Sequence, residues 1–411
     1  MKNMQYTILA SAALTTCLML TTSVFGGNPD RAGSAGAGQL LINPWAQSNG
    51  MAGTNMAITE GLEGTFLNAA GLAFINQNEL RFANTQYLSG SGISLNAIGF
   101  ATTVGDGSVL GLSVMTMGFG DIPITTENLP EGGIGTFSPS FSNIGVTYSK
   151  AFSNSIYGGI TMRIVSEAIS NVRASGVCFD AGIRYVSGDR LNFGIALRNV
   201  GAPMRFAGDG LTVTATPQGS ATSLTMLQRS ERYELPSLVN IGFGYDVYQS
   251  EMINTTLTGQ FISNSFTKDQ FGGGLEFSYN DRFALRAGYL WEEGVSSDES
   301  STTAFTGPSA GFSVNLPASQ DGAMIGIDYS YRTTNPFNGN HSIGIVLSLL
   351  FDILSRSGGG LPAPSSSKIR IFIEALEEKA RSLGFLFFAS TPNGHGRYLL
   401  LYERRLATPQ R

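Results

Sequence analysis

The sequence predicts an all-β protein, a transmembrane, 14-stranded antiparallel β-barrel of the outer-membrane type. Three observations predict it: long segments of alternating apolar and polar residues, connections whose length depends on their place in the series, and an unusual composition. Of 411 residues, 52 are glycine and only 13% are charged, while the mean hydropathy is +0.07. The 26 Phe and 14 Tyr exclude a disordered chain. No apolar run of about 20 residues follows the N-terminus, which excludes a bundle of membrane-spanning helices.

Residues 1–26 are typical of a secretory signal peptide. Lys2 precedes the apolar run Tyr6–Leu20, and small residues follow up to Gly26, after which we expect cleavage. The alternative is a buried N-terminal helix. Removal of the leader leaves one cysteine, Cys178, so the mature chain can form no internal disulfide.

Residues 27–78 are apolar and rich in glycine, but they are too irregular for a membrane strand. The segment contains Trp45, Phe66 and Asn68 within its apolar stretches. We expect it to lie inside the barrel as an N-terminal hatch.

Residues 79–351 form a series of alternating segments, and we expect them to make the transmembrane barrel. In one of them Val177, Phe179 and Ala181 alternate with Cys178 and Asp180. Successive side chains of a strand point to opposite faces, so each segment has one apolar and one polar face. A soluble sandwich also alternates, but a tilted strand needs about 9–11 residues to cross a bilayer, and many of these segments are that long. The candidate strands are 79–88, 91–103, 107–118, 137–150, 153–167, 172–187, 190–200, 236–249, 251–264, 267–279, 281–293, 306–316, 321–333 and 340–351.

The connections between these strands are of two kinds. Every link from an even to an odd strand is short, while the long links 119–136, 201–235 and 294–305 all join an odd strand to an even one. Short turns at one end and long loops at the other are typical of a barrel in the outer membrane of a cell. An even number of strands then predicts that both termini are periplasmic.

The predicted lumen carries charges of both signs. A sheet in lipid must close on itself, because no water is present to satisfy an open edge. Charges of opposite sign on the inner face favour a paired, partly filled interior over a wide pore; simple packing of the lumen is the alternative to a gating role. The inward-facing charged residues are Arg163, Glu167, Asp180, Arg184, Arg198, Glu276, Arg286, Asp328 and Arg332.

The C-terminal residues do not belong to the barrel series. Residues 352–367 are rich in Gly, Pro and Ser and read as a flexible linker. Residues 368–411 then predict a small β-α-β-β module of unknown role, whose helix would end at Gly384 and whose hairpin would turn at Asn393-Gly394.

No catalytic, metal-binding or cofactor-binding pattern stands out. The two histidines, His341 and His395, have no cluster of partners at metal-ligand spacing, and no serine motif supports a catalytic triad. The sequence therefore predicts a protein that is not an enzyme and that needs no cofactor. A net charge of −5 gives no reason to expect nucleic acid as a partner.

Apolar residues in the long loops are candidates for partner binding. Such residues on an outer loop indicate a surface for another molecule, and loops folded over the barrel mouth are the alternative. The candidates are Phe119, Ile122, Leu129, Met204, Phe206, Leu211 and Met226.

Four segments resemble the PorV/PorQ family of the type IX secretion system, which is itself similar to the FadL family of fatty-acid transporters. The segments are Leu41–Gly53, Phe66–Ala73, Leu197–Met204 and Leu235–Gly242, and the likeness covers residues 38–351. It implies a 14-stranded barrel with an N-terminal hatch, in agreement with the strand count. The family's Asn-Pro-Ala is here Asn68-Ala69-Ala70, so the rigid turn of a proline is missing. Residues 352–411 are not part of the family pattern.

Two functions follow as hypotheses. The resemblance implies an outer-membrane carrier that receives the C-terminal signal domain of exported cargo at a large translocon barrel and passes the cargo to the surface attachment machinery. Its partners would be the translocon, the cargo proteins and outer-membrane lipid. The alternative is a FadL-like transporter of a hydrophobic small molecule, with a pocket above the hatch.

Overall fold

The computed structural model describes residues 31–349 except 76–77, 189, 217, 220–221, 298–299 and 319–322. The chain divides into two compact units, Met1–Asp352 and Ile353–Arg411, and all described residues belong to the first. The expected signal peptide 1–26, linker 352–367 and module 368–411 lie outside the described residues. Among the described residues, no helix is long and apolar enough to cross a membrane.

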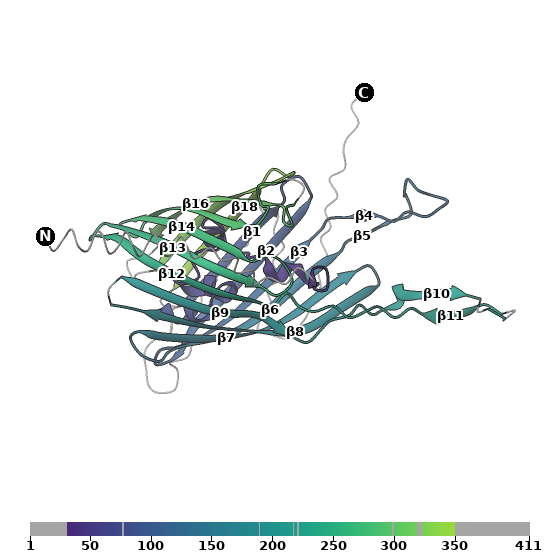
Figure 1. The fold of residues 1–411 in the computed structure, drawn as a ribbon, viewed down its shortest axis with the longest axis horizontal. Coiled ribbons are helices and arrows are strands. Elements are labelled where there is room, and N and C mark those ends of the chain that lie inside the picture. Colours follow the sequence, from purple (N-terminus) through teal and green to yellow (C-terminus); the bar gives the residue numbers. More distant parts are fainter. Residues whose placement is uncertain are drawn as a thin grey trace, which may run out of the picture. The chain divides into compact units, whose positions relative to one another are not determined.

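Fourteen antiparallel strands form a closed barrel, as predicted (Figure 1). Strands that follow one another around the wall pair with each other, and pairing of the first with the last closes the sheet, so that Asn78 lies opposite Leu349. The strands are β1 (Asn78–Tyr87), β2 (Ile93–Gly105), β3 (Ser108–Gly118), β6 (Ser140–Ala151), β7 (Ile156–Ile169), β8 (Val172–Val186), β9 (Leu191–Gly201), β12 (Leu238–Gln249), β13 (Ile253–Asn264), β14 (Gln270–Tyr279), β15 (Phe283–Glu292), β16 (Phe305–Pro317), β17 (Met324–Thr334) and β18 (Asn340–Leu349).

The wall of the barrel is apolar outside and polar inside. In β7 the side chains of Ile160, Met162 and Ile164 are 62%, 43% and 46% exposed, whereas Thr161 and Arg163 between them are buried. This is the reverse of a soluble protein, in which burial removes apolar side chains from water. An apolar outer face with a polar lumen is the pattern of a transmembrane barrel, in which lipid covers the outside.

The two ends of the barrel differ as the connection lengths predict. At one end, here called the short-turn end, β2 and β3 are joined across only Asp106-Gly107. At the other, the long-loop end, two loops carry small hairpins that the sequence analysis treated as loop: β4 (Ile122–Pro123) with β5 (Thr136–Phe137), and β10 (Thr212–Ala215) with β11 (Leu224–Leu227). Figure 1 shows both hairpins reaching beyond the strands of the barrel. A short 3₁₀ helix, η5 (Asp209–Leu211), precedes β10.

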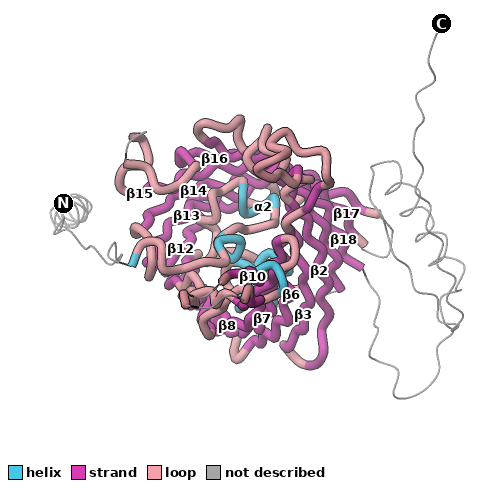
Figure 2. Tube along the Cα trace, turned by 90° about the vertical axis from the view of Figure 1, so that its right-hand side faces the viewer, coloured by secondary structure: helices cyan, strands magenta, loops and turns pink. Residues whose placement is uncertain are grey.

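The hatch lies inside the ring of strands, where Figure 2 shows its helical turns. It contains the 3₁₀ helices η2 (Gly38–Leu41), η3 (Gly61–Phe66) and η4 (Ala69–Phe74) and one short α-helix, α2 (Ala46–Asn49). The prediction that the apolar, irregular segment fills the lumen is therefore confirmed for its described part.

The first described residues, from Arg31 on, lie at the long-loop end, whereas both chain ends lie outside the described residues. Arg31 forms an ion pair of 2.7 Å with Glu234, in the β9–β12 loop, and lies over the ring of Phe266, in the β13–β14 loop. Gly36 donates its backbone N–H to the carbonyl of Glu234. The chain then runs through the lumen and enters β1 at the short-turn end. With an even number of strands, β1 begins and β18 ends at the same end of the barrel. The residues before β1 lie where the path of the hatch takes them.

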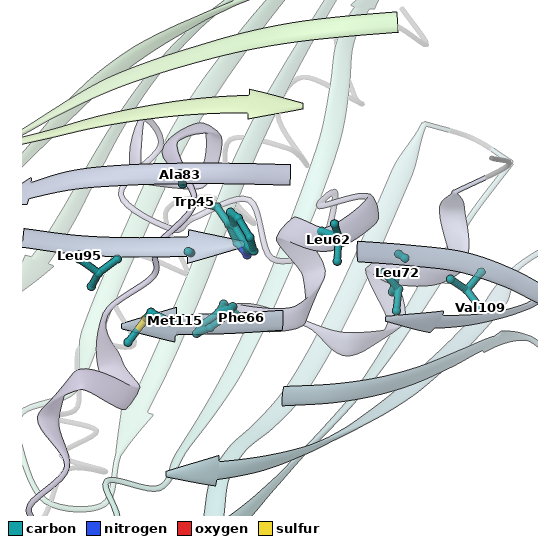
Figure 3. Packing of buried hydrophobic residues seen from close by; sticks show 10 residues of the cluster. Trp45, Leu62, Phe66, Leu72, Ala83, Leu95, Val109 and Met115 are labelled. Carbon is teal, nitrogen blue, oxygen red and sulfur yellow. The ribbon is translucent and has the colours of Figure 1, made fainter. Parts of the chain in front are cut away.

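A hydrophobic cluster joins the hatch to one side of the wall (Figure 3). Trp45 and Phe66 of the hatch meet edge to face with ring centroids 6.2 Å apart. Leu62 and Leu72 complete the hatch side, and β2 and β3 contribute Leu95, Val109 and Met115, among others. Burial of a large apolar side chain is worth about 1.5–3 kcal/mol, so this contact holds the hatch firmly against β1, β2 and β3.

Candidate functional site

Glycines in the wall leave room for the hatch. A Cβ atom on Gly182 would lie 2.1 Å from Oδ1 of Asn68, and one on Gly288 would lie 2.3 Å from the backbone of Met51. Gly311 and Gly50 lie so close that a side chain on either would meet the other's backbone. These glycines therefore set how closely the hatch approaches the wall.

Asn68 stabilises the turn of the hatch that, in the PorV/PorQ family that the segment resembles, contains a proline. Its Oδ1 accepts the backbone N–H of Ala70 at 3.1 Å, and its Nδ2 donates to the carbonyl of Ile183 at 3.1 Å. An Asn side chain that caps a helix in this way restrains the turn without a fixed φ angle. The rigidity expected to be missing at Ala69 is thus supplied by hydrogen bonds to η4 and β8.

Arginines of the wall bind carbonyl groups of the hatch. Arg163 donates through Nη2 to the carbonyl of Thr65 and to Asp180, both at 2.8 Å, and its guanidinium lies 4.2 Å from the ring centroid of Phe66. Arg184 repeats the arrangement, with its Nη1 2.9 Å from the carbonyl of Thr59. Hydrogen bonds from a charged donor contribute about 1.5–3 kcal/mol each, so these residues fasten the hatch rather than line an open pore.

A buried acid of the hatch, Glu63, pairs with the wall. Its Oε1 lies 2.5 Å from Nη1 of Arg81, and its Oε2 accepts both the N–H and the hydroxyl of Ser48. Arg81 also pairs with Glu79 at 3.0 Å and lies 3.8 Å from Asp328. The interaction therefore joins two turns of the hatch to strands β1 and β17.

This network continues around the wall. Asp328 accepts a hydrogen bond from Ser313, which in turn accepts one from Arg286, and Arg286 pairs with Glu276 at 2.5 Å. The pairing of lumen charges predicted from the sequence is present here. Sequence reasoning missed Glu63, Glu79 and Arg81, although the alternation of β1 places the last two on the inner face.

A cavity of about 260 Å³ lies between the hatch and the wall toward the long-loop end. Its floor is hatch, including Asn43 and Leu67, and its sides come from β9, β1 and the strands from β12 to β18. Thr267 and Thr303, in the β13–β14 and β15–β16 connections, place it near the loops. The opposite side of the lumen is filled by the cluster around Trp45.

The predicted hatch residues contact the wall at separate places. Trp45 and Phe66 share the cluster of Figure 3, whereas Asn68 lies against β8.

The predicted loop residues are not gathered into one surface. Ile122, Leu129 and Met226 are exposed, but Phe119 is half-buried against Phe141. Leu211 is partly buried in η5.

Met204 is buried, contrary to the expectation of an exposed loop residue. It packs among Leu40 of the hatch, Val165 of β7 and other buried residues, because the loop folds back over the barrel mouth at this point. Phe206 packs beside it, with its ring 5.8 Å from that of Tyr233.

His341 and Cys178, whose side chains could take part in catalysis, lie in the barrel wall. His341 is within hydrogen-bond distance of the hydroxyl of Tyr329, at 2.9 Å, and Cys178 is buried. Within the described ranges, no group of three His, Cys, Asp or Glu side chains could hold a metal ion.

Comparison with solved structures identifies a shared fold. The toluene transporter TodX of Pseudomonas putida is 12% identical, with a TM-score of 0.50 over 75% of this chain and 98% of TodX. A deltaS2S3 mutant of TodX, described as a monoaromatic hydrocarbon channel, is 13% identical, with a TM-score of 0.50 over 74% and 97%. A FadL homologue of Pseudomonas aeruginosa is 13% identical, with a TM-score of 0.44 over 74% and 96%.

No protein-family model and no curated protein matches the chain. The similarity to TodX is one of fold: both chains form a closed β-barrel of similar extent.

We predict that Gly288→Ala loosens the hatch. The added methyl group would overlap the backbone of Met51, and overpacking of this kind costs about 1–3 kcal/mol. Hydrogen exchange at the hatch amides should accelerate accordingly. Gly273→Ala is the matched control, since its new atom would meet nothing closer than 3.9 Å. Equal exchange in the two variants would contradict the close packing.

We predict that Glu63 itself contributes more to the stability of the docked hatch in acid than at neutral pH. Burial raises the pKa of Glu63 from 4.5 to about 6, against the opposing effects of Arg81 and Ser48. Because the folded chain holds the proton of Glu63 more tightly than the unfolded chain does, this proton stabilises the native state by about 2 kcal/mol below pH 4.5. The contribution is lost as the pH rises through about 6. Chemical unfolding in detergent at pH 4 and pH 7 measures it.

In that experiment Glu63→Gln should lack this part of the pH dependence, because glutamine resembles the neutral acid. Glu127→Gln, in an exposed loop, should retain it. A Glu63→Gln variant with the wild-type pH profile would show that Glu63 does not titrate in this range.

Proposed function

We propose that the protein is an outer-membrane transporter that takes up a small molecule from the long-loop side and releases it past the hatch. The observation that carries the proposal is the cavity of about 260 Å³ between hatch and wall. Ligand pockets commonly measure about 300–1,000 Å³, so this one suits a small compound.

The position of the cavity supports uptake from the loops. It is lined by residues of two connections at the long-loop end, and α2 of the hatch lies against β16, β17 and β18 on the same side of the lumen. We infer that a molecule bound in the cavity still has hatch between itself and the short-turn end. Passage requires part of the hatch to move.

The similarity to TodX supports the same proposal at the level of fold. TodX is described as a toluene transporter, and a barrel with this fold is suited to moving small molecules across the outer membrane. The fold alone does not carry the substrate of TodX over to this chain.

Tethering of the hatch tests the proposal. The hydroxyls of Thr54 in the hatch and Thr258 in β13 are 3.0 Å apart, so cysteines at these positions would bring two sulfur atoms close together for cross-linking by an oxidant. In proteoliposomes we expect Thr54→Cys/Thr258→Cys to take up solute poorly when oxidised and normally after reduction.

The single variants Thr54→Cys and Thr258→Cys control for the substitutions themselves. Native Cys178 is buried and can remain. Uptake by the oxidised double variant at the rate of the reduced one would overturn gating by the hatch. Absence of uptake by the wild-type protein for every solute tried would overturn the transport function.

A second candidate function is the carrier of the type IX secretion system, with a surface for exported cargo. The observation that favours it is the exposed apolar surface of the two hairpins, on which Ile122, Leu129 and Met226 are exposed and Leu227 is 71% exposed. Apolar residues grouped on projecting hairpins are suited to contact with a protein partner. The PorV/PorQ resemblance agrees with this reading.

Removal of the hairpin 212–227 tests the carrier function. Under this hypothesis the variant should lose capture of cargo signal domains in native pull-downs, yet keep a folded barrel, because the deletion spares Met204 and Tyr233, which pack against the wall. The variant with Leu224, Met226 and Leu227 all changed to Ser should behave alike. Undiminished capture by both would rule out the hairpin as the cargo site.

A further inference from the structure

We propose that the cavity binds a small organic anion, with a carboxylate or similar group held by Arg198 and Arg332 and its remaining polar atoms held by amides of the wall. The inference rests on the proposed transport function and names the class of its substrate. It differs from the hydrophobic molecule expected from the sequence, and it follows from the charge, the hydrogen-bonding groups and the shape of the cavity.

The charge of the cavity wall is positive. Arg198 and Arg332 line it, and no Asp, Glu or Lys is among its described lining residues. Arg198 lies on β9 and Arg332 on β17, which are six places apart in the circle of fourteen strands. The two guanidinium groups therefore come from nearly opposite sides of the lumen and act on the same space.

These two arginines differ from the other arginines of the lumen. Arg81, Arg163, Arg184 and Arg286 each have a carboxylate within 4 Å. Within the part of the chain that the structure describes, neither Arg198 nor Arg332 has one. Asp180 acts on Arg198, and Glu292 on Arg332, only from beyond that distance. A buried cation without a close partner is costly, and a bound anion relieves that cost.

Arg332 is held in place by an aromatic ring rather than by an acid. Its guanidinium lies 3.7 Å from the ring centroid of Phe305, which itself packs against Tyr87 with centroids 6.2 Å apart. Among the described residues it forms neither an ion pair nor a hydrogen bond. Stacking on a ring orients a guanidinium while leaving its N–H groups free for a ligand.

Arg198 is fixed to the hatch. Its Nη2 donates to the carbonyl of Leu40 at 3.2 Å, while its Nε has no hydrogen-bond partner among the described atoms. An anion bound at Arg198 would therefore be connected to η2 of the hatch through this hydrogen bond. The hatch is the element that has to move for passage.

Amide and hydroxyl groups dominate the rest of the lining. Asn43, Asn240 and Gln260 each have one buried polar atom without a hydrogen-bond partner, and Asn264, Gln270 and Asn340 lie on the same cavity. Polar groups at the cavity surface lose their hydrogen bonds to water when a hydrocarbon fills the space, at a cost of about 1–3 kcal/mol each. A solute with several hydrogen-bonding atoms, or water that enters with it, could offset that cost.

Apolar side chains provide a surface for the body of the ligand. Leu41 and Leu67 of the hatch and Ile262 and Leu290 of the wall share the cavity with the polar groups. The volume of about 260 Å³ excludes a long acyl chain in an extended form. A compact ring or short chain bearing an acidic group could place its apolar part against these side chains and its acidic group against the arginines.

A pair of probes of similar size tests the inference: benzoate, an anion, and toluene, which is neutral. We expect the purified full chain in nanodiscs to bind benzoate at least tenfold more tightly than toluene, with affinity that falls as salt increases. Arg332→Gln should weaken benzoate binding about tenfold and leave toluene unaffected. Arg332→Lys should restore part of the affinity, because it restores the charge.

The control is Arg282→Gln, an exposed arginine beyond the barrel's short-turn end, which should bind benzoate as the wild type does. Heat-modifiable migration on gels verifies that each variant is a folded barrel. Equal or tighter binding of toluene, or an Arg332→Gln variant that binds benzoate normally, would overturn the anion site while leaving transport intact. Uptake of neither probe by wild-type proteoliposomes, together with binding of neither, would overturn both proposals.

Discussion

Hydrogen bonding of the backbone in a medium without water is the constraint on which the rest of the structure depends. Lipid offers no partner to an unpaired N–H or C=O group, so the sheet has to close, as β1 and β18 do here. Closure turns one face of every strand inward. The composition follows, with apolar side chains such as Ile160 on the outside and polar side chains such as Arg163 on the inside.

An enclosed lumen raises a second problem, since a polar interior needs partners of its own. The hatch supplies them on one side by placing carbonyl groups beside Arg163 and Arg184 and a carboxylate beside Arg81. Glycines such as Gly288 allow the two surfaces to come close enough for these bonds. On the other side the hatch leaves a cavity in which Arg198 and Arg332 have no carboxylate partner within the described ranges. This difference between the two sides of the lumen is the basis of the binding function that we propose.

The cavity and the outer hairpins support different functions, and the two do not compete for the same residues. The proposed small-molecule transport would depend on Arg332, the amides of the wall and movement of the hatch. Cargo binding would depend on exposed residues such as Leu227, outside the barrel. The barrel fold is compatible with both functions, because its strands form a constant wall while the hatch and the loops carry the side chains that would bind a ligand or a partner.

Alternation of apolar and polar residues was enough to predict the barrel, its fourteen strands and the two faces of its wall, because a strand has a period of two and lipid acts on every strand alike. The irregular segment with Trp45, Phe66 and Asn68 could also be assigned to a hatch. The place where the hatch enters, the burial of Met204 and the contact of Glu63 with Arg81 became visible only in the folded chain. The hatch has no regular period, so nothing in its spacing encodes which wall residue each turn will meet. Pairing of residues distant in the chain, and the cavity left between them, arise from packing of the whole.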